Sequence, residues 1–502
     1  MPPSPPAALL PVRRRFRRLL SGLALAVGVA AAVVLPVPAR AFYFRLDGDR
    51  IWLQAERTPL AAVLDQFARA GVEVWADPGI DGTLTGTLRG EELSDGLDAM
   101  LGRYDYLLSW RLLAGPLGKV PKLRSIRVFS PGRSGSAVRR DAPARTTFDI
   151  TRGVTGRGPE FVRDELLVAV RPGTTYEQFR TLLDQTGGML VESQDGVYLV
   201  RFPPGTNIEA LLPQLRRSPI VAHAELNHAV RLPPGAASAA AASLPAVAPP
   251  ADGTIPVAVL DSGLDPASPA AGYASAAWDA VAPDTPITDP VGHGTQMALL
   301  ASGAATADGW QSAGTALPVV AVRTFDANGA TSDFALLQAL AYAKKAGARV
   351  VNMSWGSDTP SDFVASALRR AADDGLVLVA AAGNGGAPAD AYYPAAYDGV
   401  LAVAGTTPDG ASVWSGSSTG PYVDLAAPAT STTRTGNTVT GLAGTSVSSA
   451  AVAGAIARWL NQHPEATSAD AVAALKAALS PAAGPGTGTG TLDADALSRY
   501  LK

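Results

Sequence analysis

Residues 254–263 read Thr-Ile-Pro-Val-Ala-Val-Leu-Asp-Ser-Gly, an apolar run that ends at a carboxylate and a glycine. An apolar run without polar alternation is typical of a strand buried on both faces, as in a parallel sheet covered by helices. From Thr254 onward such runs alternate with alanine-rich helical patterns, which predicts repeated βαβ units. Because open parallel sheets carry their functional groups at the carboxyl ends of the strands, Asp261 lies where chemistry is expected.

Two further glycine-containing patches, Gly-His-Gly-Thr at 292–295 and Gly-Thr-Ser-Val-Ser at 444–448, present His293 and Ser446. Glycines on both sides of a histidine let the backbone bring its ring close to a partner, and a serine at a helix start faces unpaired N–H groups. Taken singly, each patch is better explained as a turn, a buried imidazole or an N-cap. Together with Asp261, however, the histidine and serine are the parts of a nucleophilic hydrolase.

A fourth patch follows a strand-like run at 377–382 and reads Gly383-Asn384-Gly385. The side-chain amide of Asn384 can donate to a tetrahedral oxyanion there, a contribution of roughly 3 kcal/mol. Asn384 would therefore provide the stabilisation of the oxyanion that the Asp, His and Ser patches do not provide.

The order Asp261, His293, Asn384, Ser446 and the residues around each of them resemble the subtilisin-like serine peptidases, the subtilases. The resemblance covers 253–502. It implies an α/β domain with a doubly wound, mainly parallel sheet, a catalytic triad of Asp, His and Ser, an oxyanion hole that includes the Asn, and protein or peptide substrates. It also implies that an extended substrate binds along four residues, Ser354, Trp355, Gly356 and Gly383.

The chain departs from the family pattern beside Ser446 and beside His293. Ala450-Ala451 replaces the usual Pro-His pair after the serine, and Gln296 replaces a histidine that commonly follows Gly-His-Gly-Thr. Two alternatives to a general endopeptidase therefore stay open. One is a weakly active or inactive binding module, and the other is a protease that cleaves only itself. An α/β-hydrolase esterase is disfavoured, because the Gly-x-Ser-x-Gly elbow is absent around Ser446.

Residues 161–232 read as a small α+β domain, βαββαβ-like, and resemble the subtilase propeptide. The matching features are a strand followed by Pro-Gly and the closing Val-x-x-Ala-Glu-x-Asn at 221–227. The resemblance implies a domain that assists folding and lays its tail through the active site. The segment 233–252 is almost entirely Ala, Pro and Ser, so we expect an extended linker in which the propeptide is cleaved.

Residues 42–132 form another predicted α+β unit, βαββαβ-like, with helical patterns that begin at Pro59 and around Leu93. The pattern resembles the short N-terminal domain of secretins and TonB-dependent receptors, which implies an envelope protein as partner; an unrelated small α+β domain fits equally well. A linker rich in Arg, Gly, Ser and Pro is predicted at 133–160.

Residues 1–41 carry a basic cluster at 13–18, an apolar stretch to Pro38 and Ala39-Arg40-Ala41. This order predicts a cleaved signal peptide and export from a bacterium that is Gram-negative, to the periplasm, the outer envelope or the medium. An uncleaved signal is the one expected route to a membrane.

The 502 residues are enough for several domains, and they carry a net charge of -3 and no cysteine. We therefore expect no nucleic-acid partner, no disulfide and no thiolate chemistry. We also expect no cofactor and no metal. Many subtilases bind calcium, but no compact acidic loop of suitable spacing is present.

Overall fold

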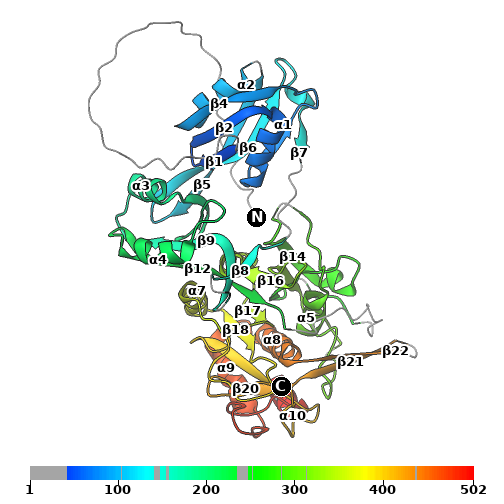
Figure 1. The fold of residues 1–502 in the computed structure, drawn as a ribbon. Coiled ribbons are helices and arrows are strands. Elements are labelled where there is room, and N and C mark those ends of the chain that lie inside the picture. Colours follow the sequence, from blue (N-terminus) through cyan, green and yellow to red (C-terminus); the bar gives the residue numbers. More distant parts are fainter. Residues whose placement is uncertain are drawn as a thin grey trace, which may run out of the picture. The chain divides into compact units, whose positions relative to one another are not determined.

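The computed structural model describes residues 42–102, 104–140, 147–153, 156, 158–233, 247–251, 253–283, 285–312, 314–435 and 438–502 (Figure 1). The predicted signal peptide and most of the predicted linker at 233–252 lie outside these residues. Two compact units are present. One contains the described residues up to Arg140 together with Val168–Ala224, and the other contains 147–167 and Glu225–Lys502.

The larger unit is built on a seven-stranded sheet in which every neighbouring pair is parallel. The strands, in spatial order, are β14 (Ala274–Asp279), β15 (Val319–Arg323), β13 (Val257–Asp261), β17 (Val350–Met353), β18 (Val377–Ala381), β19 (Val400–Thr406) and β20 (Leu425–Pro428). After β13 the chain forms β14 at one edge, returns to β15 between β14 and β13, and then adds β17 to β20 in succession on the other side of β13. The sheet is therefore doubly wound, as predicted, and Asp261 lies at the switch point where such sheets hold their functional groups.

Helices cover both faces of this sheet. They are α5 (His293–Ser302), α6 (Asp333–Lys345), α7 (Asp362–Asp373), α8 (Thr445–Gln462), α9 (Ser468–Ala478) and α10 (Ala494–Tyr500). One core contains side chains of α5, α8, α9 and α10 together with alternate residues of the strands, such as Val257 and Val259. The intervening strand residues point to the opposite face, where α6 and α7 pack together. Figure 1 shows α8 across β17 and β18.

Shorter elements complete the larger unit. They are β8 (Ile150–Arg152), the 3-10 helix η2 (Pro269–Tyr273), β16 (Ala330–Ser332) and the antiparallel hairpin β21 (Thr430–Thr435) and β22 (Thr438–Ala443).

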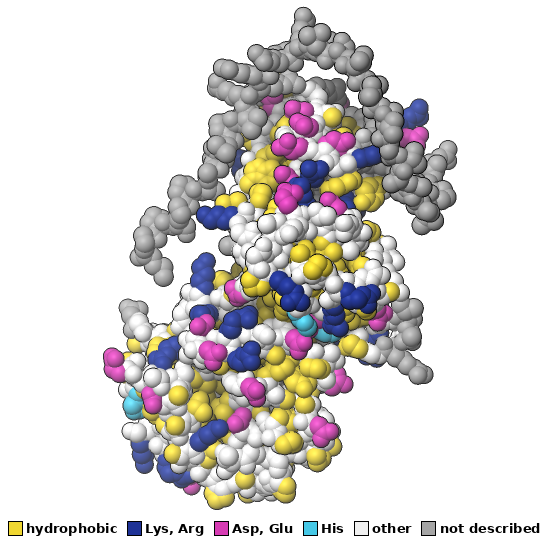
Figure 2. Space-filling view, turned by 90° about the vertical axis from the view of Figure 1, so that its left-hand side faces the viewer, with side chains coloured by type: hydrophobic (Ala, Val, Ile, Leu, Met, Phe, Trp, Pro, Cys, Tyr) yellow, Lys and Arg dark blue, Asp and Glu magenta, His cyan; other side chains and the backbone are white. Residues whose placement is uncertain are grey.

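On the face drawn in Figure 2, basic and acidic side chains are interspersed. Among the described residues, no helix combines the length and the apolar character that a bilayer crossing requires.

The smaller unit begins with two sheets, of order β1-β2-β4 and β5-β6-β3-β7. Their elements are β1 (Tyr43–Asp47), β2 (Arg50–Pro59), α1 (Leu60–Arg69), β3 (Glu73–Ala76), β4 (Thr83–Glu92), α2 (Leu93–Leu101), β5 (Asp105–Gly115), β6 (Gly118–Phe129), η1 (Ser134–Ser136) and β7 (Val138–Arg140). The apolar faces of α1 and α2 pack into one core with both sheets. This domain of residues 42–140 is called the N-terminal domain below.

The rest of the smaller unit, residues 168–224, contains α3 (Tyr176–Thr186), β10 (Met189–Gln194), β11 (Val197–Arg201) and α4 (Ile208–Arg217). It is called the propeptide core below. A capping box of Thr175 and Gln178 starts α3, and Gly187 ends it at φ 76°. Two longer strands, β9 (Glu160–Val170) and β12 (Val221–Arg231), contribute residues to both units.

One detail differs from the sequence expectation. The segment predicted to be a linker at 133–160 carries β7, which pairs with β3, and β8, which pairs with β9. The segment is polar, and it forms strands because neighbouring strands offer backbone edges, which local composition does not reveal.

The helices α5 and α8 pack closely against each other. A Cβ atom on Gly454 would lie 2.5 Å from the carbonyl oxygen of Ala301. Because interiors pack at crystal-like density, we expect Gly454→Ala to lower the free energy of unfolding by about 1–3 kcal/mol, measured by urea denaturation. Gly272→Ala is the control, since a Cβ there meets nothing within 4 Å. Equal stability of the two variants would contradict this account of the helix packing.

Candidate active site

Asp261 is the last residue of β13 and has no solvent exposure. One carboxylate oxygen, Oδ1, accepts hydrogen bonds from Nδ1 of His293 and from the backbone N–H of Ser262, both at 2.7 Å. The other oxygen, Oδ2, is buried and has no hydrogen-bond partner among the described residues. The imidazole and one backbone N–H therefore provide the observed stabilisation of this buried charge.

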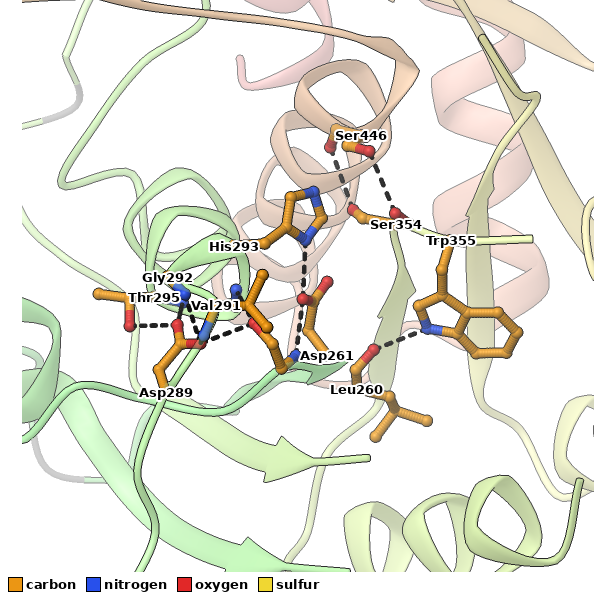
Figure 3. Close-up of polar contacts among 12 residues, drawn as sticks. Leu260, Asp261, Asp289, Val291, Gly292, His293, Thr295, Ser354, Trp355 and Ser446 are labelled. Atoms are coloured by element: carbon orange, nitrogen blue, oxygen red, sulfur yellow. Dashed lines mark hydrogen bonds and ion pairs between the residues drawn. The ribbon is translucent and has the colours of Figure 1, made fainter. Parts of the chain in front are cut away.

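His293 is the first residue of α5, and Gly292 before it has φ 87°, the left-handed conformation that favours glycine. Gly294 is required for a different reason. A Cβ at that position would lie 2.5 Å from the carbonyl oxygen of Gly263, in the turn after β13. The glycines thus bring the start of α5 against the end of β13, as their pattern indicates. Figure 3 shows Nδ1 turned to Asp261, with Ser446 beyond the opposite edge of the ring.

A second carboxylate, Asp289, holds this turn and was missed by the sequence analysis. Its Oδ1 accepts from the N–H of Gly292 and from the hydroxyl of Ser262, both at 2.7 Å, while Oδ2 accepts from the N–H and hydroxyl of Thr295 at 2.7 and 2.6 Å. The signal that could have found it is the Asp-Pro-Val-Gly run just before His293, since an aspartate in such a run caps the backbone a few residues on.

Burial and charge act in opposite directions on His293. Burial lowers its pKa, whereas the charge of Asp261, the hydrogen bond to it and the charge of Asp289 raise the pKa, and the net effect is a pKa above the usual value. A neutral imidazole with its proton on Nδ1 leaves Nε2 available as a base.

Ser446 is the second residue of α8, whose N-cap is Gly444. Its hydroxyl donates to the backbone carbonyl of Ser354 at 3.1 Å, and the hydroxyl of Ser354 donates back to the carbonyl of Ser446 at 3.1 Å. The side chain of Ser446 is thus held against the segment after β17, and its proton is not directed at His293. The helix continues regularly through Ala450-Ala451, both of which lie in the core between α8 and the sheet.

Asn384 follows β18 and is exposed. Its Oδ1 accepts two hydrogen bonds from Thr445, one from the N–H and one from the hydroxyl, both at 2.9 Å. Because the acceptor end is fixed by Thr445, the Nδ2 end of the amide is the donor left beside Ser446. A Cβ on Gly444 would lie 3.2 Å from this nitrogen.

The predicted substrate-binding residues lie on both sides of Ser446. Ser354 contacts it directly, and the N–H of Gly383 donates to the hydroxyl of Thr445 at 3.2 Å. Trp355 is buried, and its Nε1 donates to the carbonyl of Leu260 at 2.7 Å. Its side chain is therefore buried against β13, and its backbone is the part that is placed to contact a peptide.

The end of β12 occupies the edge that these residues form. The strand pairs antiparallel with β16, and Arg231 also makes an antiparallel bridge to Gly356. One residue on, the N–H of Leu232 donates to the carbonyl of Gly329 at 2.8 Å. The chain here is an added strand bonded on both sides, the geometry by which clefts of this kind bind extended peptides.

Two side chains of β12 cap helices of the larger unit. The carboxylate of Glu225 accepts from the hydroxyl of Ser361 at 2.7 Å and from the N–H of Phe363 at 3.2 Å, at the start of α7. Asn227 accepts from the N–H of Phe334 at 3.1 Å, at the start of α6. Acceptors at helix N-termini satisfy donors that have no partner within the helix and interact favourably with the helix dipole.

His228, the next residue along β12, lies beside Asp333, whose Oδ2 is 3.1 Å from its Nδ1. Burial, above all, raises the pKa of Asp333, with the charge of Glu225 adding to this and His228 opposing it. The possible ligand atoms of Glu225, His228 and Asp333 lie within 4.8 Å of one another. This set does not fit calcium, which takes six to eight oxygen ligands, because it includes a nitrogen and a carboxylate already engaged as a helix cap.

Two family models match parts of this chain. A family model described as the subtilase family matches residues 252–496, and one described as the fervidolysin N-terminal prodomain matches 152–227. A thermostable alkaline protease of Halalkalibacterium halodurans is 34% identical over 215 residues, which are 42% of this chain and 58% of the relative. Thermitase of Thermoactinomyces vulgaris is 36% identical over 203 residues, 39% of this chain and 72% of the relative.

Among solved structures, fervidolysin of Fervidobacterium pennivorans, described as a keratinolytic enzyme related to subtilisin, superimposes with a TM-score of 0.54 at 21% identity. The match covers 71% of this chain and 63% of fervidolysin, and at this identity it shows the fold alone. The chain thus spans less than two thirds of the length of fervidolysin and of the alkaline protease.

The opposed influences on His293 give a titration test. In a Ser446→Ala chain we expect its ring to titrate above pH 6.5. Since the folded pKa exceeds the unfolded one, the stabilisation from this pair is complete below about pH 6.5 and is lost as the pH rises through the folded pKa. Asp261→Asn leaves burial as the main influence, so the pKa should fall below 6.5.

The measurement is NMR of the imidazole Hε1 proton, with a His293→Gln spectrum to assign the signal. A titration midpoint that stays in place in Asp261→Asn would show that the carboxylate does not control the imidazole.

Proposed function

The chain belongs to the subtilase family, and from this membership we propose that it is a serine endopeptidase that uses Asp261, His293 and Ser446. The observation that carries the proposal is the buried 2.7 Å hydrogen bond between Asp261 and Nδ1 of His293, at the switch point of the sheet and next to a serine at a helix N-terminus. A histidine oriented by a buried carboxylate and placed beside a hydroxyl is the arrangement that activates a serine nucleophile.

The first step is a proton transfer. Rotation about the Cα–Cβ bond of Ser446 moves its hydroxyl from the carbonyl of Ser354 to Nε2 of His293. His293 takes the proton as Ser446 attacks the scissile carbonyl, and returns it to the departing amine. Asp261 keeps the other ring proton on Nδ1 and stabilises the imidazolium while it exists.

The developing oxyanion is stabilised by donors that are already in place. The Nδ2 amide of Asn384 is free to donate because its oxygen is held by Thr445, and the N–H of Ser446 is one of the unpaired donors at the start of α8. Preorganised donors of this kind need no reorganisation when the charge forms.

The substrates of the proposed enzyme are proteins or peptides bound in extended conformation between Gly356 and the chain around Gly329. The tail at Arg231 and Leu232 supports this, since it pairs with both edges. In this proposal residues 161–232 are the enzyme's own inhibitor, and activation requires cleavage in 233–252. The basic and apolar run at 13–41 supports export of the precursor.

Loss of the nucleophile provides the decisive test. The processed wild-type enzyme should react with a fluorophosphonate probe and hydrolyse unfolded casein, and Ser446→Ala should do neither. Ser448→Ala is the matched control, because Ser448 lies on the same helix and its hydroxyl donates to the carbonyls of Ala427 and Pro428. Probe reaction without casein turnover would limit the enzyme to its own propeptide, and equal labelling of wild type and Ser446→Ala would refute the catalytic role.

The oxyanion donor has a separate test. Asn384→Ala should lower kcat by about 100- to 1000-fold with little change in KM, the magnitude known for such donors in this family. Asn384→Asp preserves the acceptor contacts to Thr445 but removes the donor and adds a negative charge, so it should be at least as impaired. If Asn384→Asp kept most of the activity, Asn384 would matter for the turn rather than for the oxyanion.

A further inference from the structure

The long hairpin β5–β6 extends beyond the core of the N-terminal domain. That core uses the hairpin only as far as Trp110 and Leu123. Nearer the tip, Leu113, Leu117 and Val120 are 6%, 8% and 2% exposed, yet none of them belongs to that core. Other residues of the same unit must therefore cover the tip, and they are those of the propeptide core.

The covering group includes Tyr198 of β11, which is 1% exposed. Its hydroxyl oxygen accepts a hydrogen bond from the N–H of Leu117 at 3.2 Å, in the turn of the hairpin. A Cβ on Gly115 would lie 2.6 Å from this oxygen, and a Cβ on Gly196 would lie 3.3 Å from the ring of Pro116. The turn of the hairpin thus fits closely against β11.

Beside this contact the hairpin makes an ionic one. Glu192 of β10 pairs with Arg111 of β5 and lies 3.9 Å from Nζ of Lys122 of β6. The side chains of Glu192 and Lys122 are 16% and 15% exposed, so this is not a solvated surface pair. Little of the charge of Glu192 and Lys122 is screened by water here, whereas the side chain of Arg111 is 44% exposed. Loss of Glu192 would therefore leave the buried charge of Lys122 incompletely compensated.

A second strand of the N-terminal domain contacts the opposite end of β10. Arg45 of β1, 9% exposed, donates to the carbonyl of Gly188 at 2.8 Å and pairs with Asp184 of α3 at 3.3 Å. Both sheets of the N-terminal domain therefore contact the propeptide core through buried polar groups. A module tethered only by a flexible linker would not show such contacts.

We propose that the N-terminal domain is part of the inhibitor, a clamp whose partner is this chain's own propeptide core. A segment of about 60 residues buries too little apolar surface to be firmly stable alone, and the clamp supplies additional core and ion pairs. Its effect is to keep α3, β10 and β11 folded and so to prolong the life of the inhibited precursor. The effect on activation rests on the proposed function, whereas the clamp itself does not.

The hairpin tip gives the sharpest test, in full-length chains carrying Ser446→Ala. Gly115→Val should lower the hydrogen-exchange protection of amides in 189–201 by about tenfold or more and leave those of α1 unchanged. Gly86→Val is the control, because Gly86 lies in β4 of the same domain and a Cβ there meets nothing within 4 Å. If protection at 189–201 were the same in both variants, the clamp would be refuted.

The ionic contact predicts opposite changes for two neighbours. Burial, opposed by Glu192 and reinforced by Arg111 and Arg201, lowers the pKa of Lys122 to about 8. The unfolded chain therefore binds more protons than the folded one between about pH 8 and 10.5, so clamp stability should rise with pH in that window. At pH 7, Glu192→Gln should reduce protection at 189–201, whereas Lys122→Met should increase it and remove the pH dependence. Reduced protection in both, or no change in either, would contradict the clamp.

The same substitutions in chains that keep Ser446 test whether the clamp delays activation. Gly115→Val should shorten the lag before peptidase activity appears, and Gly86→Val should not. If no variant showed activity, the proposed function would fail while the exchange result still decided the clamp. If activity appeared with an equal lag in both, the clamp would have no role in inhibition.

Discussion

Asp261 is a carboxylate without solvent exposure at the end of the central strand, and burying such a charge costs several kcal/mol unless donors surround it. The donors are the N–H of Ser262 and the imidazole of His293, which comes from a different element. To bring that imidazole to the strand, α5 must begin where it does, with glycine at 294 and the carboxylate of Asp289 to hold the turn. The architecture around the site thus follows from satisfying one buried charge.

Helix N-termini are the second recurring device. Ser446 lies at the start of α8, where unpaired N–H groups and the dipole favour negative charge. The strand β12 exploits the same property, because Glu225 and Asn227 cap α7 and α6. Its end is then hydrogen bonded on both sides, at Gly356 and Gly329. In the proposed enzyme the end of β12 therefore occupies the backbone groups at Gly356 and Gly329 to which an extended substrate would bind.

The smaller unit changes the interpretation of the N-terminal domain. Its sequence resembles a docking module, and an envelope partner stays a prediction that no comparison supports. The structure instead gives this domain a partner within the chain, through Arg45, the β5–β6 tip and Glu192. The propeptide core is small for independent stability, and the N-terminal domain buries part of its surface. The second feature therefore compensates for the first.

The sequence by itself determined the doubly wound α/β domain and the positions of Asp261, His293, Asn384 and Ser446, because apolar runs and glycine-flanked polar residues are local patterns. Only the tertiary structure decided which groups these residues meet. Asp289, the inward side chain of Trp355, the bond from Ser446 to Ser354 and the covered hairpin tip all depend on segments far apart in the chain. Such contacts carry no local signal, because each is made by ordinary residues whose role arises only when separate strands and helices pack together.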